Sequence, residues 1–158
     1  MILKEEDGTS VVEFAIIAPL LFVILFGIIE FGVLLYDKAM ITNAAREGAR
    51  AGIVYDTNLR DQDGVIDDIA LSTQVQSSVN NYLGGKLISF VGEPSVTVPL
   101  PTVSDENNDS ILSSGDSLKV TVNFVYQFLV FSRVIDLIGG DSFGDSINLQ
   151  AVSVMRLE

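Results

Sequence analysis

Gly8-Thr-Ser-Val-Val-Glu-Phe14 leads directly into an apolar run that continues to Tyr36, and this run decides how the chain is built. Within residues 11–36 only Glu13 and Glu30 are charged. A helix of about 26 residues, rising about 1.5 Å per residue, is about 39 Å long, whereas the hydrocarbon core of a bilayer is about 30 Å thick. The run therefore predicts a membrane-spanning helix, in which an ionised carboxylate is costly and needs a partner.

Two other interpretations of this segment fit less well. A cleaved secretory signal has a shorter apolar core and small residues at its exit, but here residues 36–39 are Tyr-Asp-Lys-Ala. A helix buried in a soluble protein needs a domain that covers apolar side chains on all faces, and the remaining chain suffices for only one modest domain. We expect a retained membrane anchor. The positive-inside rule either places the end after the span in the cytoplasm or decides nothing, because Lys4 lies before the span and Lys38, Arg46 and Arg50 lie after it.

The composition argues against several classes of function. The chain has 158 residues, with 9 basic against 21 acidic side chains, whereas binding to nucleic acid phosphates needs clustered Lys and Arg. It contains no cysteine and no histidine. This removes disulfides, zinc-thiolate sites, the commonest general base and the commonest transition-metal ligand. We therefore expect a protein that is not an enzyme, has no cofactor and does not bind nucleic acid.

The first helix is expected to continue outside the membrane through residues 37–54, which are rich in alanine and charged helix formers and contain no proline. Four small residues form one face of this extension: Ala45, Gly48, Ala49 and Gly52. Small residues at this spacing let a second helix approach closely. The alternative is a flexible exit from the membrane, weakened by glycine. We favour the packing face, with Glu47 and Arg50 as an i,i+3 ion pair on the outside.

Residues 56–68 form a polar, acidic loop that resembles the middle of an EF-hand calcium loop. The three weak candidates for metal ligands are Asp61, Asp63 and Asp67. In that alignment the first ligand position is Leu59 and the last is Ala70, so the bidentate carboxylate that closes such a site is missing. An acidic turn is the better interpretation, with Asp67 and Asp68 as capping acids for the helix that follows.

Residues 68–83 predict a second helix, because apolar side chains recur there at helical spacing and Gly84-Gly85 ends it. Its expected core face consists of Leu71, Val75, Val79 and Tyr82. Further along, the pattern predicts strands at Leu87–Val91, Val96–Val98, Ser117–Phe128 and from Ile147 to about Leu157. Between these, 102–116 reads as an acidic loop, and Phe131–Ile138 suits either a short helix or a strand. The pattern is that of an α+β protein with one long helix, a second helix and a small antiparallel sheet.

Gly8, followed by Glu13 and Phe14, resembles the processing site of type IV prepilins and their pseudopilin relatives. Joined to Pro19, the apolar run and the block Asn43-Ala-Ala-Arg-Glu-Gly-Ala-Arg50, it is similar to the TadE-like proteins of tight-adherence (Tad/Flp) pilus systems. The strong similarity covers residues 8–52, and the ending 151–156 is also similar. Gly-x4-Glu alone is unspecific, but the combination is specific.

The resemblance implies a pilin-like, membrane-anchored minor pseudopilin that takes part in assembling a surface pilus. A prepilin peptidase would cut between Gly8 and Thr9, which divides the chain into a leader (1–8), a membrane helix with its extension (9–55) and an extracytoplasmic domain (56–158). The leader would lie in the cytoplasm and the helix in the cytoplasmic membrane. The implied partners are the peptidase, other pilus subunits, the inner-membrane assembly platform and the lipid bilayer.

Cleavage gives Glu13 a hypothetical role in assembly. Thr9 would then carry a free cationic amine, and the carboxylate of Glu13 would pair with the amine of a neighbouring subunit. Mutual neutralisation would offset the cost of holding either charge in lipid. Glu30 lies further along the run and would either serve similarly or reach the outer interface.

Two other functions stay open. The chain could be a single-pass anchored binding or adhesion module unrelated to pili, in which case the spacing of Gly8 and Glu13 is coincidental. It could also be an anchored enzyme that works through carboxylates and a metal in the 56–68 loop. No apolar pocket is implied there, which disfavours the enzyme.

Overall fold

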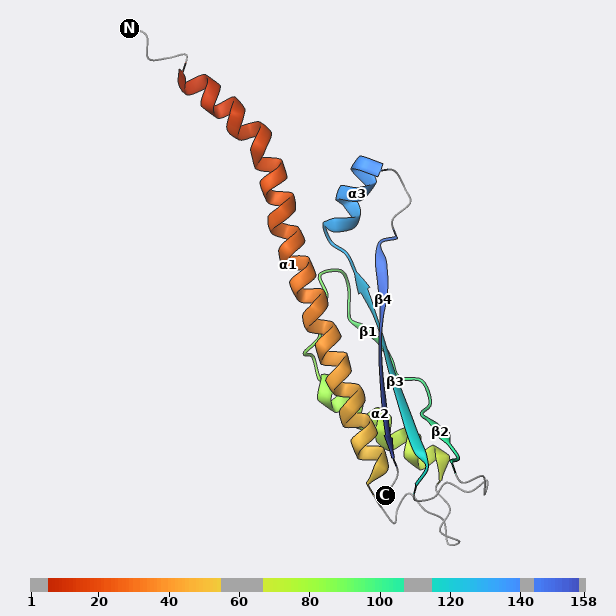
Figure 1. The fold of residues 1–158 in the computed structure, drawn as a ribbon. Helices are drawn as coiled ribbons and strands as arrows, with labels where there is room; N and C mark the ends of the chain where they lie inside the picture. Colours follow the sequence, from red (N-terminus) through yellow and green to blue (C-terminus); the bar gives the residue numbers. More distant parts are fainter. Residues whose placement is uncertain (1–5, 55–66, 107–114, 140–143, 157–158) are drawn as a thin grey trace.

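A computed structural model describes residues 6–54, 67–106, 115–139 and 144–156. The elements, in chain order, are α1 (Glu6–Ile53), α2 (Asp68–Leu83), β1 (Ser95–Thr97), β2 (Thr102–Ser104), β3 (Ser117–Gln127), α3 (Phe131–Gly139) and β4 (Ser146–Arg156). The expected α+β architecture is confirmed. Figure 1 shows α1 as a long rod whose carboxyl-terminal half packs beside α2 and the sheet, while its amino-terminal half projects beyond them.

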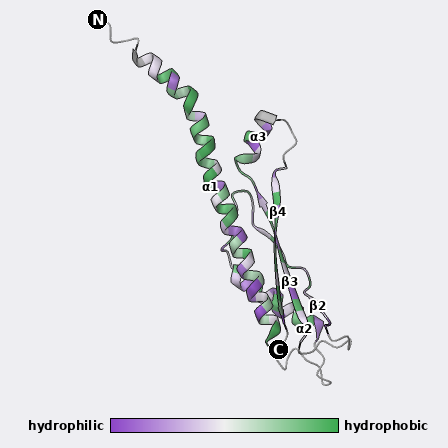
Figure 2. Ribbon diagram, viewed as in Figure 1, coloured by the Kyte–Doolittle hydropathy of each residue, from purple (hydrophilic) through white to green (hydrophobic). Residues whose placement is uncertain are grey.

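The long first helix runs without interruption through Pro19 to Ile53. Figure 2 shows how its character changes along its length: hydrophobic residues dominate the projecting half, and hydrophilic residues are interspersed along the packed half. Glu47 and Arg50 form the expected ion pair on its surface, with 2.7 Å between Oε1 and Nη2. Alanine and charged helix formers therefore carry the helix well beyond the apolar run, as predicted.

The second helix has the predicted bounds because both of its ends are capped. Oδ1 of Asp67 accepts the amides of Ile69 at 2.8 Å and Ala70 at 3.2 Å, and the amide of Gly84 donates to the carbonyl of Asn80 at 2.9 Å. Leu71, Val75 and Val79 are buried as predicted, but the last buried residue is Leu83 and Tyr82 is only half-buried.

The sheet is antiparallel throughout and is built around β3. Strand β4 pairs with β3 along its whole length, from Ser117 opposite Arg156 to Gln127 opposite Ser146. The short strands β1 and β2 pair with β3 at residues 123–125 and 117–119. Alternate residues of β3 are buried: Leu118, Val120, Val122, Phe124 and Tyr126. This alternation is the one that the sequence predicts for a sheet with one covered face.

Two sequence expectations need correction, and one alternative that the sequence left open is decided. Residues 87–91 form no strand: they lie between two glycines of positive φ, Gly85 at 74° and Gly92 at 69°, and the amide of Ile88 donates to Asp37 of α1 instead of to a neighbouring strand. The loop expected at 102–116 begins with β2, because Thr102–Ser104 pairs with β3. Residues 131–139, ambiguous in sequence, are helical.

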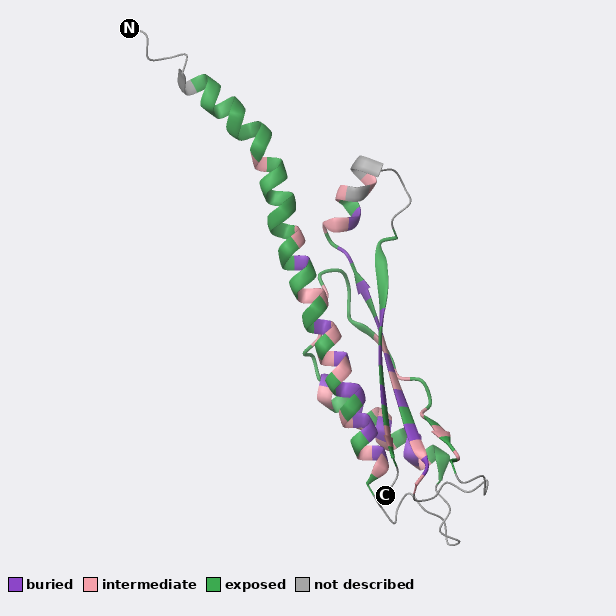
Figure 3. Cartoon of the chain, viewed as in Figure 1, coloured by how far each residue is buried: buried purple, intermediate pink, exposed green. Residues whose placement is uncertain are grey.

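The hydrophobic core lies between α1, α2 and the inner face of the sheet (Figure 3). From α1 it receives Ile41, Ala44, Ala45 and Ala49, all fully buried. Alanine and glycine on this face allow α1 to lie close to α2. The two glycines are Gly48 and Gly52: a Cβ added to Gly48 would lie 2.6 Å from Cγ2 of Val79, and one added to Gly52 would lie 2.5 Å from Cδ2 of Leu118.

Candidate functional site

The projecting half of α1 is the first candidate functional feature. From Gly8 to Ile29 its residues are exposed except for Ala18 and Gly27, which are half-exposed, and the first buried residue is Glu30 (Figure 3). Residues 11–29 would span about 28 Å at about 1.5 Å per residue, close to the thickness of about 30 Å of a bilayer core. By length and composition, α1 is able to cross a membrane. Residues 8–29 of α1, called the naked part below because no other element covers them, thus end where the folded domain begins.

The residues of the expected processing site lie at the start of this naked part. Gly8 has no atom within 4 Å of a Cβ built on it, and Thr9, Glu13 and Phe14 are exposed. Because α1 is continuous here, Thr9 and Glu13 are four residues apart on one helix face. The domain therefore covers neither the Gly8–Thr9 bond nor the carboxylate of Glu13.

Glu30, in contrast, is 3 % exposed and bonded within its own chain. Its carboxylate accepts three consecutive amides at the start of α3: that of Leu129, that of Val130 at 3.4 Å from each oxygen, and that of Phe131 at 2.9 Å. A negative charge at a helix amino terminus also interacts favourably with the helix dipole. In the described structure this carboxylate caps α3, a role that the sequence did not predict. It lies where the exposed part of α1 ends, so its expected position at the outer interface stays a prediction.

The sequence of α3 explains why the cap must come from elsewhere. The first helical hydrogen bond runs from the amide of Val134 to the carbonyl of Val130 at 3.0 Å. Val130 therefore occupies the N-cap position, where an aliphatic side chain has no acceptor to offer. The first amides of a helix need partners, so an apolar N-cap shows that the partner must come from elsewhere, but it does not identify Glu30.

A second buried acid, Asp37, lies two turns further along α1. Its Oδ1 accepts the amide of Ile88 at 3.0 Å, while within the described part of the chain its Oδ2 is buried without a hydrogen-bond partner. Burial raises the pKa of Asp37 above its ordinary value, and the amide of Ile88 lowers it in part. Nearby, burial and then the charges of Glu30 and Asp37 raise the pKa of Tyr126 to about 12.

Aromatic side chains fill the space between α1, the end of β3 and α3. Phe131 packs edge-on against Phe31 of α1, with ring centroids 6.0 Å apart, and also against Phe128 at 5.7 Å. Phe128 in turn packs edge-on against Tyr126 at 5.6 Å. The hydroxyl of Tyr126 donates to the backbone carbonyl of Glu30 at 3.4 Å. The Glu30 cap is therefore part of a packed junction.

The structure places the four small residues Ala45, Gly48, Ala49 and Gly52 against α2 and β3 of the same chain. Ala45 and Ala49 are fully buried, and the nearest atoms around the two glycines belong to Val75, Val79 and Leu118. This face is filled within the domain, and nothing of it is left for a helix from another subunit.

The acidic candidates for a metal site are not brought together in the described residues. Asp61 and Asp63 lie outside the residues that the structure describes, and Asp67 uses its carboxylate to cap α2. No group of three or more potential ligands that could hold a metal ion occurs in residues 6–54, 67–106, 115–139 and 144–156. A buried acid that the sequence did not single out, Asp116, accepts the amide of Glu106 at 3.0 Å and so links the chain just after β2 to the start of β3.

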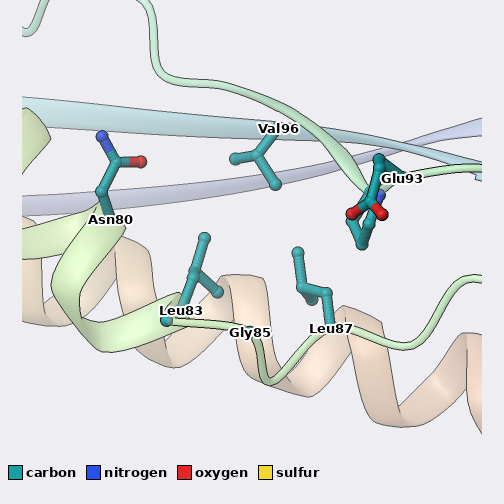
Figure 4. Close-up of a pocket in the computed structure, with 8 residues that line it drawn as sticks. Asn80, Leu83, Gly85, Leu87, Glu93 and Val96 are labelled. Atoms are coloured by element: carbon teal, nitrogen blue, oxygen red, sulfur yellow. The ribbon is translucent and has the colours of Figure 1, made fainter.

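A pocket of about 280 Å³ lies where α2 ends and the chain turns toward β1 (Figure 4). Its lining includes Asn80, Leu83, Leu87, Glu93 and Val96. Glu93 is its one ionisable side chain among the described residues that line it. A lone exposed carboxylate without a second titratable group offers no acid–base pair, so this pocket is a poor candidate for catalysis.

Comparison with known proteins bears on the exposed helix. The family model of TadE-like proteins matches residues 8–50, which confirms the resemblance drawn from the sequence. No curated protein and no solved structure matches the chain. The matched residues make up most of α1, and the helix packs on a second helix and a small antiparallel sheet in a pilin-like arrangement.

Proposed function

We propose, from the match of residues 8–50 to the TadE-like protein family, that this chain is a minor pseudopilin that takes part in assembling a Tad/Flp-type surface pilus. The observation that carries the proposal is the combination of Gly8 and Glu13 with a naked apolar helix of membrane-spanning length. A role in pilus assembly follows from the family alone, and it is a non-enzymatic role.

In this proposal the chain is processed and inserted in one direction. Prepilin peptidase cuts between Gly8 and Thr9, the new amino terminus stays at the cytoplasmic side, and the domain 56–158 lies outside the cytoplasmic membrane. The exposure of Gly8 and Thr9 on a helix that the domain does not cover supports access by a membrane protease. Other pilus subunits and the inner-membrane assembly platform are the proposed partners.

The two acids of the apolar run then have separate roles. Glu30 is already satisfied by the amides of α3, whereas Glu13 is exposed on α1 and would lie in lipid. Pairing with the amine of a neighbouring subunit's Thr9 would neutralise both charges. We expect Glu13→Ala to insert and fold normally but to reduce pilus assembly strongly, as measured by sheared surface pili. Unchanged pilus yield would argue against this pairing.

Intact-mass analysis of the membrane-extracted chain tests the proposal most directly. Loss of residues 1–8 only in cells that contain prepilin peptidase is the expected result. Gly8→Val should prevent the loss, and Gly27→Val should not, since neither glycine has a neighbour within 4 Å. A chain that keeps residues 1–8 in both strains would favour the other reading, a single-pass anchored binding or adhesion module.

A further inference from the structure

Where the naked part of α1 ends, the domain presents a second apolar surface that the proposed function does not use. Three side chains on it are exposed: Phe90 (41 %), Val91 (40 %) and Leu129 (48 %). They come from the loop between α2 and β1 and from the segment that leads into α3. An apolar pocket of about 130 Å³ separates them from α1 and is lined by Phe26, Ile29, Glu30, Phe90, Leu129 and Val130.

We propose that this surface, together with α3, inserts into the interfacial region of the bilayer leaflet that faces the domain, and that lipid acyl chains fill the pocket beside α1. The inference rests on the membrane anchoring in the proposed function, but not on pilus assembly or on the direction of insertion. It assigns a lipid contact to residues 88–91 and 129–134, outside the membrane-spanning helix.

Continuity with α1 is the first argument. Phe26 and Ile29 belong to the naked, membrane-length part of the helix, and they form one wall of the pocket whose other wall is Phe90 and Leu129. Figure 1 shows α3 projecting from the sheet toward the amino-terminal end of α1, which is the direction of the membrane. If residues 11–29 occupy the hydrocarbon core, the pocket must lie at its edge.

The Glu30 junction is the second argument, because it holds the surface at that depth. Three amides of residues 129–131 bind the carboxylate, and Phe131 packs against Phe31 of α1. The amides at the start of a helix would otherwise need water or another acceptor, which lipid cannot supply. With its polar start satisfied by Glu30, α3 is suited to a region poor in water.

Charge decides between an apolar and an electrostatic contact with lipid. The chain carries a formal net charge of −12, so anionic headgroups would repel it. Phe90, Val91 and Leu129 are apolar, and the charged side chains that line a hollow beside them are Arg133 of α3 and Asp145, one of each sign. Arginine can bury its stem while its guanidinium reaches headgroups. The contact should therefore form equally well on zwitterionic lipid and should not weaken with salt.

The chain contains no tryptophan, so one tryptophan placed by substitution reports on one site. The full chain would be reconstituted into phosphatidylcholine vesicles as four variants: Leu129→Trp and Phe90→Trp on the proposed surface, Phe22→Trp in the naked helix, and Val154→Trp near the end of β4. Val154 is 59 % exposed and belongs to the last part of β4, and this strand ends far from the amino terminus of α1 (Figure 1). Quenching by bromine on shallow or deep acyl positions, and by aqueous iodide, gives the depth of each site.

We expect blue-shifted emission at Leu129→Trp and Phe90→Trp, with strong loss of intensity to shallow bromolipid and little to iodide. Phe22→Trp should respond to deep bromolipid and Val154→Trp to iodide alone. The inference would be overturned if iodide quenched the emission at both surface sites as strongly as at Val154→Trp, with Phe22→Trp still showing membrane anchoring. The inference would also be overturned if both surface sites were shielded from iodide and from bromolipid, and if this shielding disappeared when the protein was diluted in lipid. That result would indicate contact between two copies of the chain. If bromolipid did not quench the emission of Phe22→Trp, the membrane anchoring itself would be refuted, and the inference with it.

Discussion

Two glutamates in the same apolar helix show how strongly surroundings decide what a residue does. Glu13 is exposed on a bare helix, whereas Glu30 is 3 % exposed and holds the start of α3. In lipid the first needs a partner from outside the chain, and the second has its partners already. Burying an ionised acid is tolerated when hydrogen bonds replace its water, and the three amides of residues 129–131 provide that replacement.

Removing the Glu30 carboxylate should destabilise the domain more than its small volume suggests. Glu30→Ala leaves three amides at the start of α3 without an acceptor, and we expect a loss of about 3 kcal/mol in the free energy of unfolding. Glu30→Gln keeps one carbonyl acceptor and should lose less. Urea denaturation in mild detergent measures both, with Glu93→Ala as a control at an exposed carboxylate. A Glu30→Ala chain as stable as the parent would show that α3 does not depend on this cap.

Asp37 should make the stability of the domain depend on pH in a defined direction. Burial raises its pKa in the folded state above the ordinary 3.8, so the folded state binds the proton more tightly than the unfolded state. The contribution of Asp37 to stability is then greatest below pH 3.8, falls as the pH rises through the raised folded pKa and is constant above it. Asp37→Asn keeps an acceptor for the amide of Ile88 and removes the charge.

This asparagine variant should be more stable than the parent at neutral pH, and the difference should shrink as the pH falls toward 3.8. Thermal unfolding at a series of pH values checks the prediction. Asp37→Ala, which offers no acceptor to Ile88, serves as the comparison and should not gain stability. A constant difference between Asp37→Asn and the parent at all pH values would contradict the assignment.

At the scale of elements, the contact of α1 with α2 and β3 depends on two positions that carry no side chain, Gly48 and Gly52. A Cβ on Gly52 would lie 2.5 Å from Cδ2 of Leu118 and 2.9 Å from Cγ2 of Val75. Such overpacking costs about 1–3 kcal/mol, so Gly52→Ala should destabilise the domain although alanine favours helix. Gly32→Ala is the matched control, because nothing lies within 4 Å of its Cβ, and it should be neutral or slightly stabilising. Denaturation curves that rank the two variants in the opposite order would refute the close approach.

The elements that could be predicted are those whose pattern is local. Helix α2 is recognised by helical spacing and by Asp67 and Gly84 at its ends. Strand β3 is recognised by the alternation of apolar and polar side chains from Leu118 to Phe124. The role of Glu30 was out of reach, because it bonds to an amide 99 residues further along the chain. The apolar segment 87–91 looked like a strand for the same reason: its alternative partner, Asp37, is distant in sequence.

At the scale of the whole molecule, the chain is a folded domain from which the naked part of α1 (the bare rod) projects. The carboxyl-terminal part of α1 supplies one side of the core, so the helix cannot be removed entirely without exposing the inner face of the sheet. From Gly8 to Ile29 the helix contributes no buried residue. Its exposed apolar side chains have no place in water, and this is the reason that a membrane, or neighbouring subunits, must complete the structure.

Cutting the chain at either side of Glu30 should therefore separate solubility from stability. A chain that begins at Gly27 loses most of the bare rod and keeps the α3 cap, so we expect it to be monomeric without detergent and fully folded. A chain that begins at Phe31 should be equally soluble but less stable, by about the 3 kcal/mol expected for loss of the cap. Analytical ultracentrifugation reports the first property and urea denaturation the second. Equal stability of the two chains would mean that Glu30 acts only within the membrane-anchored protein, and aggregation of both would mean that apolar residues beyond the rod, including Phe90 and Leu129, also require lipid.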